Sequence, residues 1–362
     1  MKLCICTAVY NAGEVVRYVV RSILDALGDR YSVKPIVVDS GSVDGSPHIA
    51  IEEYVRRGYK PILIKGRFNV SQARNKCLEI SEKENCDALI MIDHDVIVLD
   101  ASAIELALDT LRMLGNGIIA VPYGFKSFGS IAEALNYIDR SRCSSRCIKL
   151  VPVPWTVTGL MIIPREILAR VRFVERMNFR DDTIFGFVTW LKGVPIYMLK
   201  ADGKCFTAID VSIGRELDVY TRLGVSEYLS SIGKKVLSDV YRCSAASARG
   251  RRGSCIRLVA KYLAAASWIP GIVLSITLAL AHLMIACLGL AMLSIAELVG
   301  LVYKEFRKVR KHPLALRNAI KISLFSLASI VLFPVVYVSK RAAIYRVMES
   351  IGRTKEIELC RG

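Results

Sequence analysis

The chain lacks several features that would assign it to a familiar class. Its N-terminus, Met1–Leu3, has no signal-peptide layout and runs directly into a strand pattern. Neither an internal repeat nor a low-complexity stretch interrupts the 362 residues, and this length leaves room for one domain and an extra module. We therefore expect a globular first domain that stays in the cytosol.

Metal-finger spacing is also absent from the eleven cysteines. Cys143 and Cys147 stand four apart, with neither a second pair nor a histidine nearby, which argues against a zinc site. Cys4 and Cys6 would share one face of the first strand, where we expect them to be thiols of the core. A reducing compartment fits these cysteines best, although some cytosolic proteins from very hot habitats form disulfides.

Formal charge is missing from one long run in the C-terminal third, between Tyr262 and Ala296. About 35 helical residues would reach roughly 50 Å, which exceeds a hydrocarbon core of about 30 Å. A second apolar run, Ile322–Ser339, has about the length of one span. A buried helix of a soluble domain is the alternative for either run, but we expect this part of the chain to be embedded in a membrane.

The net charge of +17 gathers beside these apolar runs. Basic residues precede the first run and separate it from the second: Arg249, Arg251, Arg252, Arg257 and Lys261, then Lys304, Arg307, Lys308, Arg310, Lys311, Arg317 and Lys321. Positive charge that flanks membrane segments meets anionic lipid, at about 1 kcal/mol per residue near the surface. Because these cations sit beside lipid-length segments, we do not expect a nucleic-acid partner.

The first hundred residues alternate between short β-type runs and helical patterns. Expected strands cover 3–9, 34–38, 61–64 and 88–92, and expected helices cover 14–27, 47–57 and 71–81. This alternation predicts a parallel sheet wrapped by helices, with the strand C-termini along one edge, where ligands of open α/β sheets bind. The later pattern is looser, with a helix over 101–114, an extended segment over 117–122, a strand over 155–163 and paired aspartates within 179–191.

Polar clusters follow three of the expected strands: Tyr10–Asn11, Asp39–Ser46 and Asp93–Asp95. Acidic residues scattered at random would not gather where ligands bind, so we expect a ligand site at this edge. Two carboxylates two residues apart, just past a buried strand, can present oxygens to a hard cation that also holds phosphate oxygens. Strand alternation turns His94 to the other face. We therefore predict a Mg²⁺ or Mn²⁺ site at Asp93 and Asp95.

The other polar groups each have a structural alternative. The Asp39 carboxylate could accept hydrogen bonds from a base or ribose, but a loop with a helix cap explains it better on its own. Arg74 and Asn75 lie in the first turns of a helix, where a guanidinium can pair with phosphate or form a surface salt bridge. Asp181 and Asp182 could cap an apolar helix by charge, or include a general base that deprotonates an acceptor hydroxyl.

Taken together, the motifs resemble family 2 glycosyltransferases of the GT-A fold, over roughly residues 1–200. The resemblance rests on six motifs in order: Thr7–Asn11, Val38–Ser46, Ala73–Asn75, Asp93–Asp95, Thr158–Gly159 and Asp181–Asp182. It implies an α/β fold, a Rossmann-like and mostly parallel sheet flanked by helices, here followed by C-terminal transmembrane helices. It also implies a transferase that uses a nucleotide-sugar, linked to UDP or GDP, and a divalent metal.

The resemblance implies a role for each matching residue. Asp39 would contact the nucleotide base and Arg74 the donor phosphates. Asp93 and Asp95 would serve the metal, Asp95 most directly. Asp182 would be the catalytic base, with Asp181 beside it in the catalytic pair. The full donor-binding set would be Val9, Tyr10, Asn11, Asp39, Ser40, Gly41, Ser71, Arg74, Asn75, Asp93, His94, Thr158 and Gly159.

The chain departs from the family at Ser40, where Asp is common, and at Asp181, where Glu is common. The Gln-x-x-Arg-Trp signature of processive synthases is absent, which favours transfer of one sugar, as in the similar polyprenyl-phosphate sugar synthases. We therefore expect an inverting hexosyltransferase whose acceptor is a lipid phosphate such as polyprenyl phosphate. The alternatives are a transferase that extends a lipid-linked or surface glycan, and a catalytically silent membrane scaffold that retains the fold.

We expect three parts along the chain: a catalytic domain over 1–215, a basic helical or amphipathic connector over 216–262, and a membrane module over 263–362. The module would hold two transmembrane helices, or three, and a basic tail. A hairpin in the first run would keep the basic cluster at 304–311 inside, but no Gly or Pro between Ile272 and Leu288 marks a turn, which favours two spans. We expect a multi-pass protein of the cell membrane with its catalytic domain in the cytoplasm and membrane lipids as partners. The sequence leaves the oligomeric state open.

Overall fold

The computed structural model describes residues 1–156, 158–175, 181–203, 205–213, 232–248 and 315–361. The chain divides into two units. Unit 1 contains Met1–Glu216 and Tyr345–Gly362, and unit 2 contains Leu217–Ile344.

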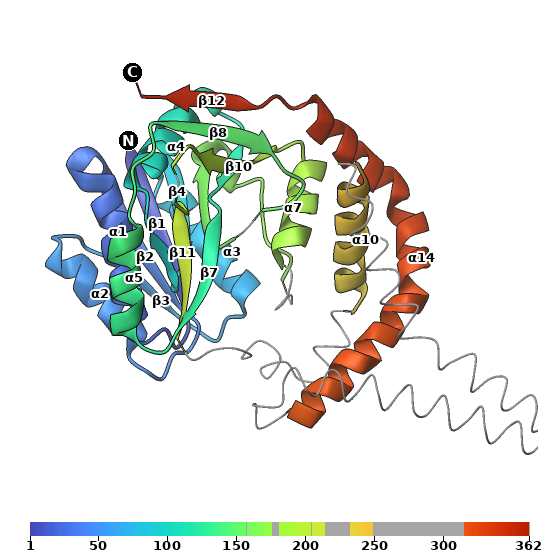
Figure 1. Cartoon of the computed structure of the whole chain (residues 1–362), viewed down its shortest axis with the longest axis horizontal. Helices are drawn as coiled ribbons and strands as arrows, with labels where there is room; N and C mark the ends of the chain where they lie inside the picture. Colours follow the sequence, from blue (N-terminus) through green and yellow to red (C-terminus); the bar gives the residue numbers. More distant parts are fainter. Residues whose placement is uncertain (157, 176–180, 204, 214–231, 249–314, 362) are drawn as a thin grey trace, which may run out of the picture. The chain divides into compact units, whose positions relative to one another are not determined.

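The first half of unit 1 is a parallel βα arrangement (Figure 1). Its strands and helices alternate in the order β1 (Lys2–Val9), α1 (Val15–Leu27), β2 (Ser32–Asp39), α2 (Ser46–Arg56), β3 (Ile62–Lys65), α3 (Val70–Lys83) and β4 (Ala88–Asp93). Strand β1 pairs in parallel with both β2 and β4, and β2 pairs in parallel with β3. The register sets Val9 opposite Asp39, and Ala8 opposite Asp93. The expected edge, at which the polar clusters meet, is therefore confirmed.

The second half of unit 1 makes the sheet mixed. In the described part, nine strands form one sheet in the order β12-β8-β10-β6-β9-β4-β1-β2-β3. The added strands are β6 (Ile118–Ala120), β8 (Cys147–Pro152), β9 (Leu160–Pro164), β10 (Ile196–Ala201) and β12 (Ile357–Cys360). Strand β9 runs antiparallel to both β4 and β6, and β8 runs antiparallel to β10 and β12. A mostly parallel sheet was expected, and parallel pairing holds for β1–β4 and for β6 with β10.

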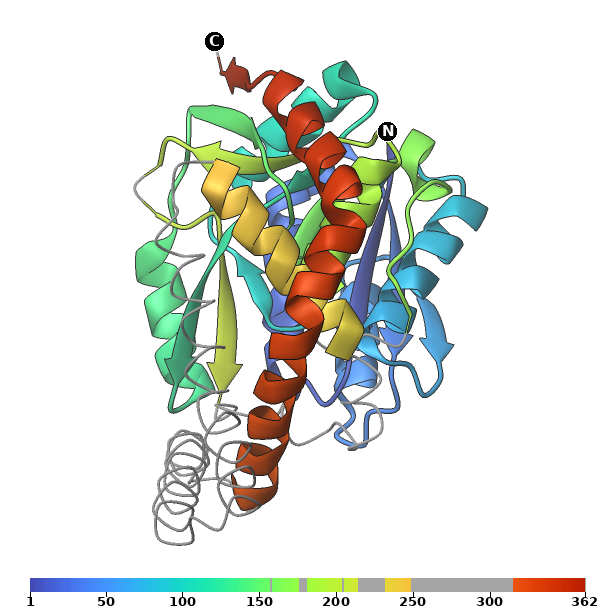
Figure 2. The ribbon, with the colours of Figure 1, turned by 90° about the vertical axis from the view of Figure 1, so that its right-hand side faces the viewer.

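A smaller sheet has the order β5-β11-β7. It consists of β5 (Val96–Val98), β11 (Ala208–Ile213) and β7 (Tyr123–Phe128), and Figure 2 shows β7 and β11 side by side. Further helices of unit 1 are α4 (Ala101–Leu114), α5 (Ile131–Ser141), α6 (Arg165–Leu168) and α7 (Asp181–Leu191). A strand was expected over 155–163, but the observed strand β9 starts later, at Leu160, just after Gly159.

The core of unit 1 follows from the apolar faces of these elements. Helix α1 packs its buried face against α2 and α4, while α3 packs against β1, β2, β4 and α6, so helices cover the sheet on both sides. Ile5 of β1, Ile90 of β4 and Val20 of α1 are all fully buried. Each such side chain contributes about 1.5–3 kcal/mol relative to an exposed one. This packing fixes the edge at which the loops after β1, β2 and β4 meet.

Disulfides link cysteines that were expected to be free thiols, so that expectation is wrong. Cys4 pairs with Cys86 and Cys6 with Cys77, at Cα–Cα distances of 5.7 and 5.6 Å. The bonds Cys143–Cys205 and Cys147–Cys360 follow in the later half of unit 1. The first two bonds span 82 and 71 residues of sequence. The packing of α3 on β1 brings Cys77 to Cys6, and the pairing of β4 with β1 brings Cys86, just before β4, to Cys4.

The C-terminal segment belongs to unit 1, which differs from the expected membrane module over 263–362. Strand β12 pairs with β8 at one edge of the large sheet (Figure 1), and Cys360 is bonded to Cys147. The Arg361 amide also donates to the carbonyl of Arg146 at 2.8 Å. The tail is therefore an edge strand of the first unit.

Unit 2 contains the described helix α10 (Ile232–Ala248) and most of α14 (Ala315–Arg353). The apolar run 262–296, the basic cluster 304–311 and most of the expected connector lie outside the described residues. The second run, Ile322–Ser339, falls within α14. Over the residues that could be searched, none of the helices combines the length and apolar character needed to cross a bilayer.

Candidate active site

The loops after β1 and β2 are joined by hydrogen bonds at the edge of the sheet. Asn11 has a left-handed backbone with φ of 45°, and its Oδ1 accepts from the Val43 amide at 2.9 Å. The Asn11 amide donates to Ser42 Oγ at 3.1 Å, and the Ser40 amide donates to the Val9 carbonyl at 3.0 Å. The two loops that carry these predicted donor-binding residues are therefore joined by one backbone hydrogen bond and two that use a side chain.

The two oxygens of the Asp39 carboxylate have different surroundings. It is 7% exposed, and Oδ1 accepts from the amides of Gly41 and Ser42 at 3.1 and 2.8 Å. These bonds fit the structural alternative, a loop closed by its own aspartate. Among the described residues Oδ2 has no hydrogen-bond partner, so a base or ribose could still bind there.

Arg74 lies at the centre of a buried ion cluster. Helix α3 is fixed by a capping box between Asn69 and Gln72, which places Arg74 in its second turn. The Arg74 Nη2 atom donates to Asp93 Oδ2 at 2.7 Å, and Nη1 is bonded to Asp181 Oδ2. The surface-salt-bridge alternative is thereby excluded, because only 5% of the Arg74 side chain is exposed.

Burial and charge act in opposite directions within this cluster. Burial alone would lower the pKa of Arg74, but Asp93 and Asp181 raise it above its ordinary value, so the guanidinium stays charged. Burial raises the pKa of Asp93, although the Arg74 charge opposes that rise and Asp95 adds to it. Paired charges of this kind stay buried only while their partners remain in place.

Asp93 and Asp95 follow β4 as predicted. Their side chains are 22% and 29% exposed, so both carboxylates can be reached from the site. The Asp93 amide donates to the Gly159 carbonyl at 2.8 Å, and the Asp95 carbonyl accepts from Val211 at 2.7 Å. Divalent cations such as Mg²⁺ are commonly held by one or two carboxylates together with substrate phosphates. The donor set fits a Mg²⁺ or Mn²⁺ ion that arrives with a phosphorylated ligand.

Three of the predicted donor-binding residues are held within the protein in this structure, and their role toward a donor stays a prediction. His94 Nδ1 lies 2.9 Å from the Ala8 carbonyl, and its Nε2 lies 3.9 Å from Asp95 Oδ2, so the ring stays beside the site carboxylates and is not turned to the other face as predicted. Asn75 exchanges two hydrogen bonds with the backbone of Phe173, at 2.8 and 3.0 Å. Ser71 is fully buried. In the described structure these side chains hold the walls of the site.

Asp181 and Asp182 begin helix α7 but face different partners. Asp181 joins the Arg74 cluster, whereas Asp182 Oδ1 accepts from the Thr183 amide at 2.7 Å. Their position in the first turn also suits the charge-cap alternative. Asp181 is part of the Arg74 cluster and Asp182 lies next to it on the same turn, while the role of Asp182 as general base stays a prediction.

Tyr123 and Asp210 are residues of the site that sequence reasoning missed. The Tyr123 ring packs over Gly159, where an added Cβ would come within 2.5 Å of its Cε1 atom. Burial and the charges of Asp93, Asp210 and Asp95 raise the pKa of Tyr123, so its hydroxyl stays protonated. No local signal marks either residue, because β7 and β11 reach the site by long-range pairing.

Two further features lie outside the carboxylate cluster. A cavity of about 500 Å³ lies along another side of α3 and shares Asn75 and Phe173 with the walls of the site. Among the described residues, three ligand-type side chains also meet at Asp100, Cys143 and Cys205. The two cysteines are bonded to each other there, and Asp100 accepts from the Ser145 hydroxyl at 2.5 Å, so we assign no metal to this group.

These observations define an α/β domain whose candidate site lies at the carboxyl edge of its parallel strands. Residues 4–152 match the sequence model of the family described as Glycosyl transferase family 2. Residues 4–152 therefore carry a family 2 glycosyltransferase domain, and this domain assigns the protein to the glycosyltransferases.

Comparison with solved structures gives distant likenesses. TarS from S. aureus is 16% identical with a TM-score of 0.41, and the match covers 64% of this chain but only 40% of TarS. The mannosyltransferase PcManGT from Pyrobaculum calidifontis, solved with GDP-Man and Mn²⁺, is 14% identical with a TM-score of 0.46, and the match covers 92% and 86% of the two chains. Glucosyl-3-phosphoglycerate synthase from Mycobacterium tuberculosis, solved with Mg²⁺ and UDP, is 18% identical with a TM-score of 0.37, and the match covers 56% and 72%. None of the curated protein sequences matches the chain.

Proposed function

We propose that the protein transfers one sugar from a UDP- or GDP-linked donor to a lipid phosphate, such as polyprenyl phosphate, at a membrane surface. The observation that carries the proposal is the contact of Arg74 with both Asp93 and Asp181. Asp93 belongs to the carboxylates expected to hold the metal, and Asp181 belongs to the pair expected to contain the base. The contact with Arg74 therefore brings these two groups together, at the edge where ligands of α/β sheets bind.

On the donor side, the chain offers hydrogen bonds and charge. The free Oδ2 atom of Asp39 suits the base or ribose, and the joined loops after β1 and β2 would hold it in position. Asp93 and Asp95 would hold the Mg²⁺ or Mn²⁺ ion, which when bound neutralises the charge that develops on the leaving diphosphate. Arg74 adds a fixed positive charge at the same place.

On the acceptor side, Asp182 would act as the base. As an oxygen of the acceptor phosphate attacks the anomeric carbon and the bond to the diphosphate breaks, Asp182 would take the proton that a singly ionised acceptor phosphate carries. One attack from the opposite face inverts the anomeric centre, so no covalent enzyme intermediate is needed. Tyr123, whose hydroxyl stays protonated, can donate a hydrogen bond within the site.

The lipid acceptor is supported by the apolar run 262–296, which lies outside the described residues, and by the basic residues beside it. A polyprenyl phosphate cannot leave the bilayer, so an enzyme that uses one gains from an anchor beside its site. Basic residues near the membrane would also attract the acceptor phosphate. A transferase that extends a lipid-linked or surface glycan is the second candidate, because the exposed ring of Phe125 beside Tyr123 suits contact with a sugar face.

The test is sugar transfer by detergent-purified full-length protein. Radiolabelled UDP- and GDP-sugars are offered with a polyprenyl phosphate and Mn²⁺ or Mg²⁺, beside Asp95→Asn and Asp182→Asn. Label that moves into the lipid phase, and is lost in both variants, supports the proposal and names the donor. Metal-dependent donor hydrolysis without a lipid product rejects the lipid acceptor and retains the transferase. Turnover that is unchanged in the variants rejects the proposed roles of these residues.

A further inference from the structure

Arg74 contacts Oδ2 of Asp93, one of the two carboxylate oxygens that this residue could offer to a cation. Its guanidinium contacts Asp93 and Asp181 at once, and all three side chains are largely buried, with exposed fractions of 5%, 22% and 12%. The remaining guanidinium nitrogen, Nε, is buried and has no hydrogen-bond partner among the described residues. The two carboxylates therefore neutralise the charge of the guanidinium, while its Nε–H donor stays without a partner in the described structure.

The position of Arg74 is fixed by its surroundings. Its guanidinium lies 5.6 Å from the centre of the Phe173 ring, and Phe173 stacks on Phe185 at 4.1 Å. One turn further along α3, Cys77 is bonded to Cys6 of β1. Because α3 is tied to the sheet at this point, the side chain can change partners but the helix cannot carry it away.

Electrostatics then sets Arg74 against a metal at Asp93. A divalent cation on that carboxylate would come close to a buried guanidinium, and like charges at such distances repel strongly where water is excluded. The repulsion ends if Arg74 gains another anion as partner. The diphosphate of a nucleotide donor supplies that anion, and Arg74 still has an unused donor at Nε.

We propose that Arg74 competes with the divalent cation for Asp93 and is drawn away by the donor diphosphate, so that metal and nucleotide bind cooperatively. Asp181 sets the strength of the competition, because it holds Arg74 partly away from Asp93. This inference rests on the metal and donor of the proposed function. It makes Arg74 a positioning residue as well as a phosphate ligand.

The experiment measures Mn²⁺ binding by detergent-purified full-length protein, from the electron paramagnetic resonance signal of free Mn²⁺. Titrations are made without nucleotide and with saturating GDP or UDP. The variants are Arg74→Met, Arg74→Lys, Asp181→Asn and the double variant Arg74→Met/Asp181→Asn. Arg140→Met is the matched control, because Arg140 is exposed on α5, outside the cluster.

We expect GDP or UDP to tighten Mn²⁺ binding to the wild type by about 10-fold or more, within the usual range of coupling between two sites. Arg74→Met should tighten Mn²⁺ binding without nucleotide by about 10-fold and lose most of the coupling. Asp181→Asn should weaken Mn²⁺ binding without nucleotide, and this loss should shrink in the double variant if Asp181 acts through Arg74. Arg74→Lys should fall between wild type and Arg74→Met, because one ammonium cannot hold both carboxylates.

Two results would overturn the inference. One is Arg74→Met protein that melts like the wild type but binds Mn²⁺ alone no more tightly. The other is an Asp181→Asn or Arg74→Lys variant whose Mn²⁺ affinity equals that of the wild type. This second result decides the question if the Arg74→Met protein does not fold. In either case Mn²⁺-dependent sugar transfer by the wild type would leave the proposed function intact. If no form binds Mn²⁺ with or without nucleotide, both the inference and the metal requirement of the proposed function fail.

Discussion

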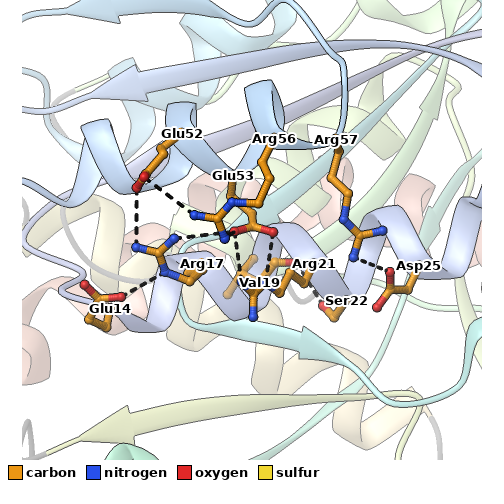
Figure 3. A network of polar contacts seen from close by, with 10 residues as sticks. All are labelled: Glu14, Arg17, Val19, Arg21, Ser22, Asp25, Glu52, Glu53, Arg56 and Arg57. Atoms are coloured by element: carbon orange, nitrogen blue, oxygen red, sulfur yellow. Dashed lines mark hydrogen bonds and ion pairs between the residues drawn. The ribbon is translucent and has the colours of Figure 1, made fainter.

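Arg21 Nε donates to Glu53 Oε1 at 2.8 Å and joins helix α1 to helix α2 on the far side of the parallel sheet from α3. Glu53 is 1% exposed, and Arg17 and Arg56 also lie within ion-pair distance of its carboxylate (Figure 3). A buried carboxylate with three guanidinium partners stabilises the packing only while all the charges remain matched.

We predict that Glu53→Gln lowers the free energy of unfolding by about 1–3 kcal/mol, because a neutral amide at this buried position has one acceptor oxygen and no charge to offer the three guanidinium groups. Thermal melting of purified protein measures the loss. Glu52→Gln is the matched control: the Glu52 side chain is 60% exposed, and its ion pairs should contribute little. Equal losses in the two variants would contradict the assignment of Glu53 as the central residue.

The same carboxylate predicts how stability depends on pH. Burial alone would raise the pKa of Glu53, but the hydrogen bond and charge of Arg21, with Arg56 and Arg17, lower it below its ordinary value. A group whose pKa is lowered in the folded state stabilises above its unfolded pKa, about 4.3, and loses that contribution as pH falls through the folded value. Melting temperature should therefore drop more steeply below about pH 4 in the wild type than in Glu53→Gln. Parallel pH curves for the two proteins would reject this role.

The disulfides predict a protein that reductant destabilises. Cys6–Cys77 closes a loop with a sequence separation of 71, and loss of such a bond typically costs about 2–5 kcal/mol. The paired variant Cys6→Ser/Cys77→Ser should melt at a lower temperature than the wild type. Because this bond is already missing, reductant should lower its melting temperature by less than it lowers that of the wild type. Thiol counting after denaturation, with and without reductant, tests the pairing itself. Free thiols at Cys6 and Cys77 in unreduced protein would show that the bond does not form.

Gly159 is predicted to tolerate no side chain, because the Tyr123 ring fills the space. An added Cβ would lie 2.5 Å from Cε1 and 2.7 Å from Cζ of that ring, so Gly159→Ala must displace the ring from the site. We expect a loss of about 1–3 kcal/mol in stability and a large loss of sugar transfer. Adding Tyr123→Val should restore the melting temperature but not transfer, since the hydroxyl is gone. A Gly159→Ala enzyme as active and stable as the wild type would exclude this packing.

The parallel half of the fold could be predicted because its signals are local. Apolar runs and amphipathic helices locate β1 through β4, and their alternation places Asp39 and Asp93 at one edge. The strand pairings of the second half could not be predicted, because β9 joins β4 and β11 joins β7 across long stretches of sequence that leave no periodic signal. Tyr123 and Asp210 were missed for this reason. Arg74 was predicted as a phosphate ligand, but its contact with Asp181 spans 107 residues of sequence and needs the whole fold.

The Cys147–Cys360 bond predicts that the two segments of unit 1 stay joined after the chain between them is cut. Strand β12 adds a ladder with β8, and the disulfide fixes it covalently. A specific protease site engineered between Leu217 and Ile344 would generate an N-terminal and a C-terminal fragment. Without reductant these fragments should migrate together on a denaturing gel, and reductant should separate them. In a Cys360→Ser protein the fragments should separate even without reductant, while under native conditions the ladder can still hold them together. If the unreduced wild-type fragments separate on the denaturing gel, the C-terminal segment is not bonded to the first unit, and its placement as an edge strand of the catalytic domain is wrong.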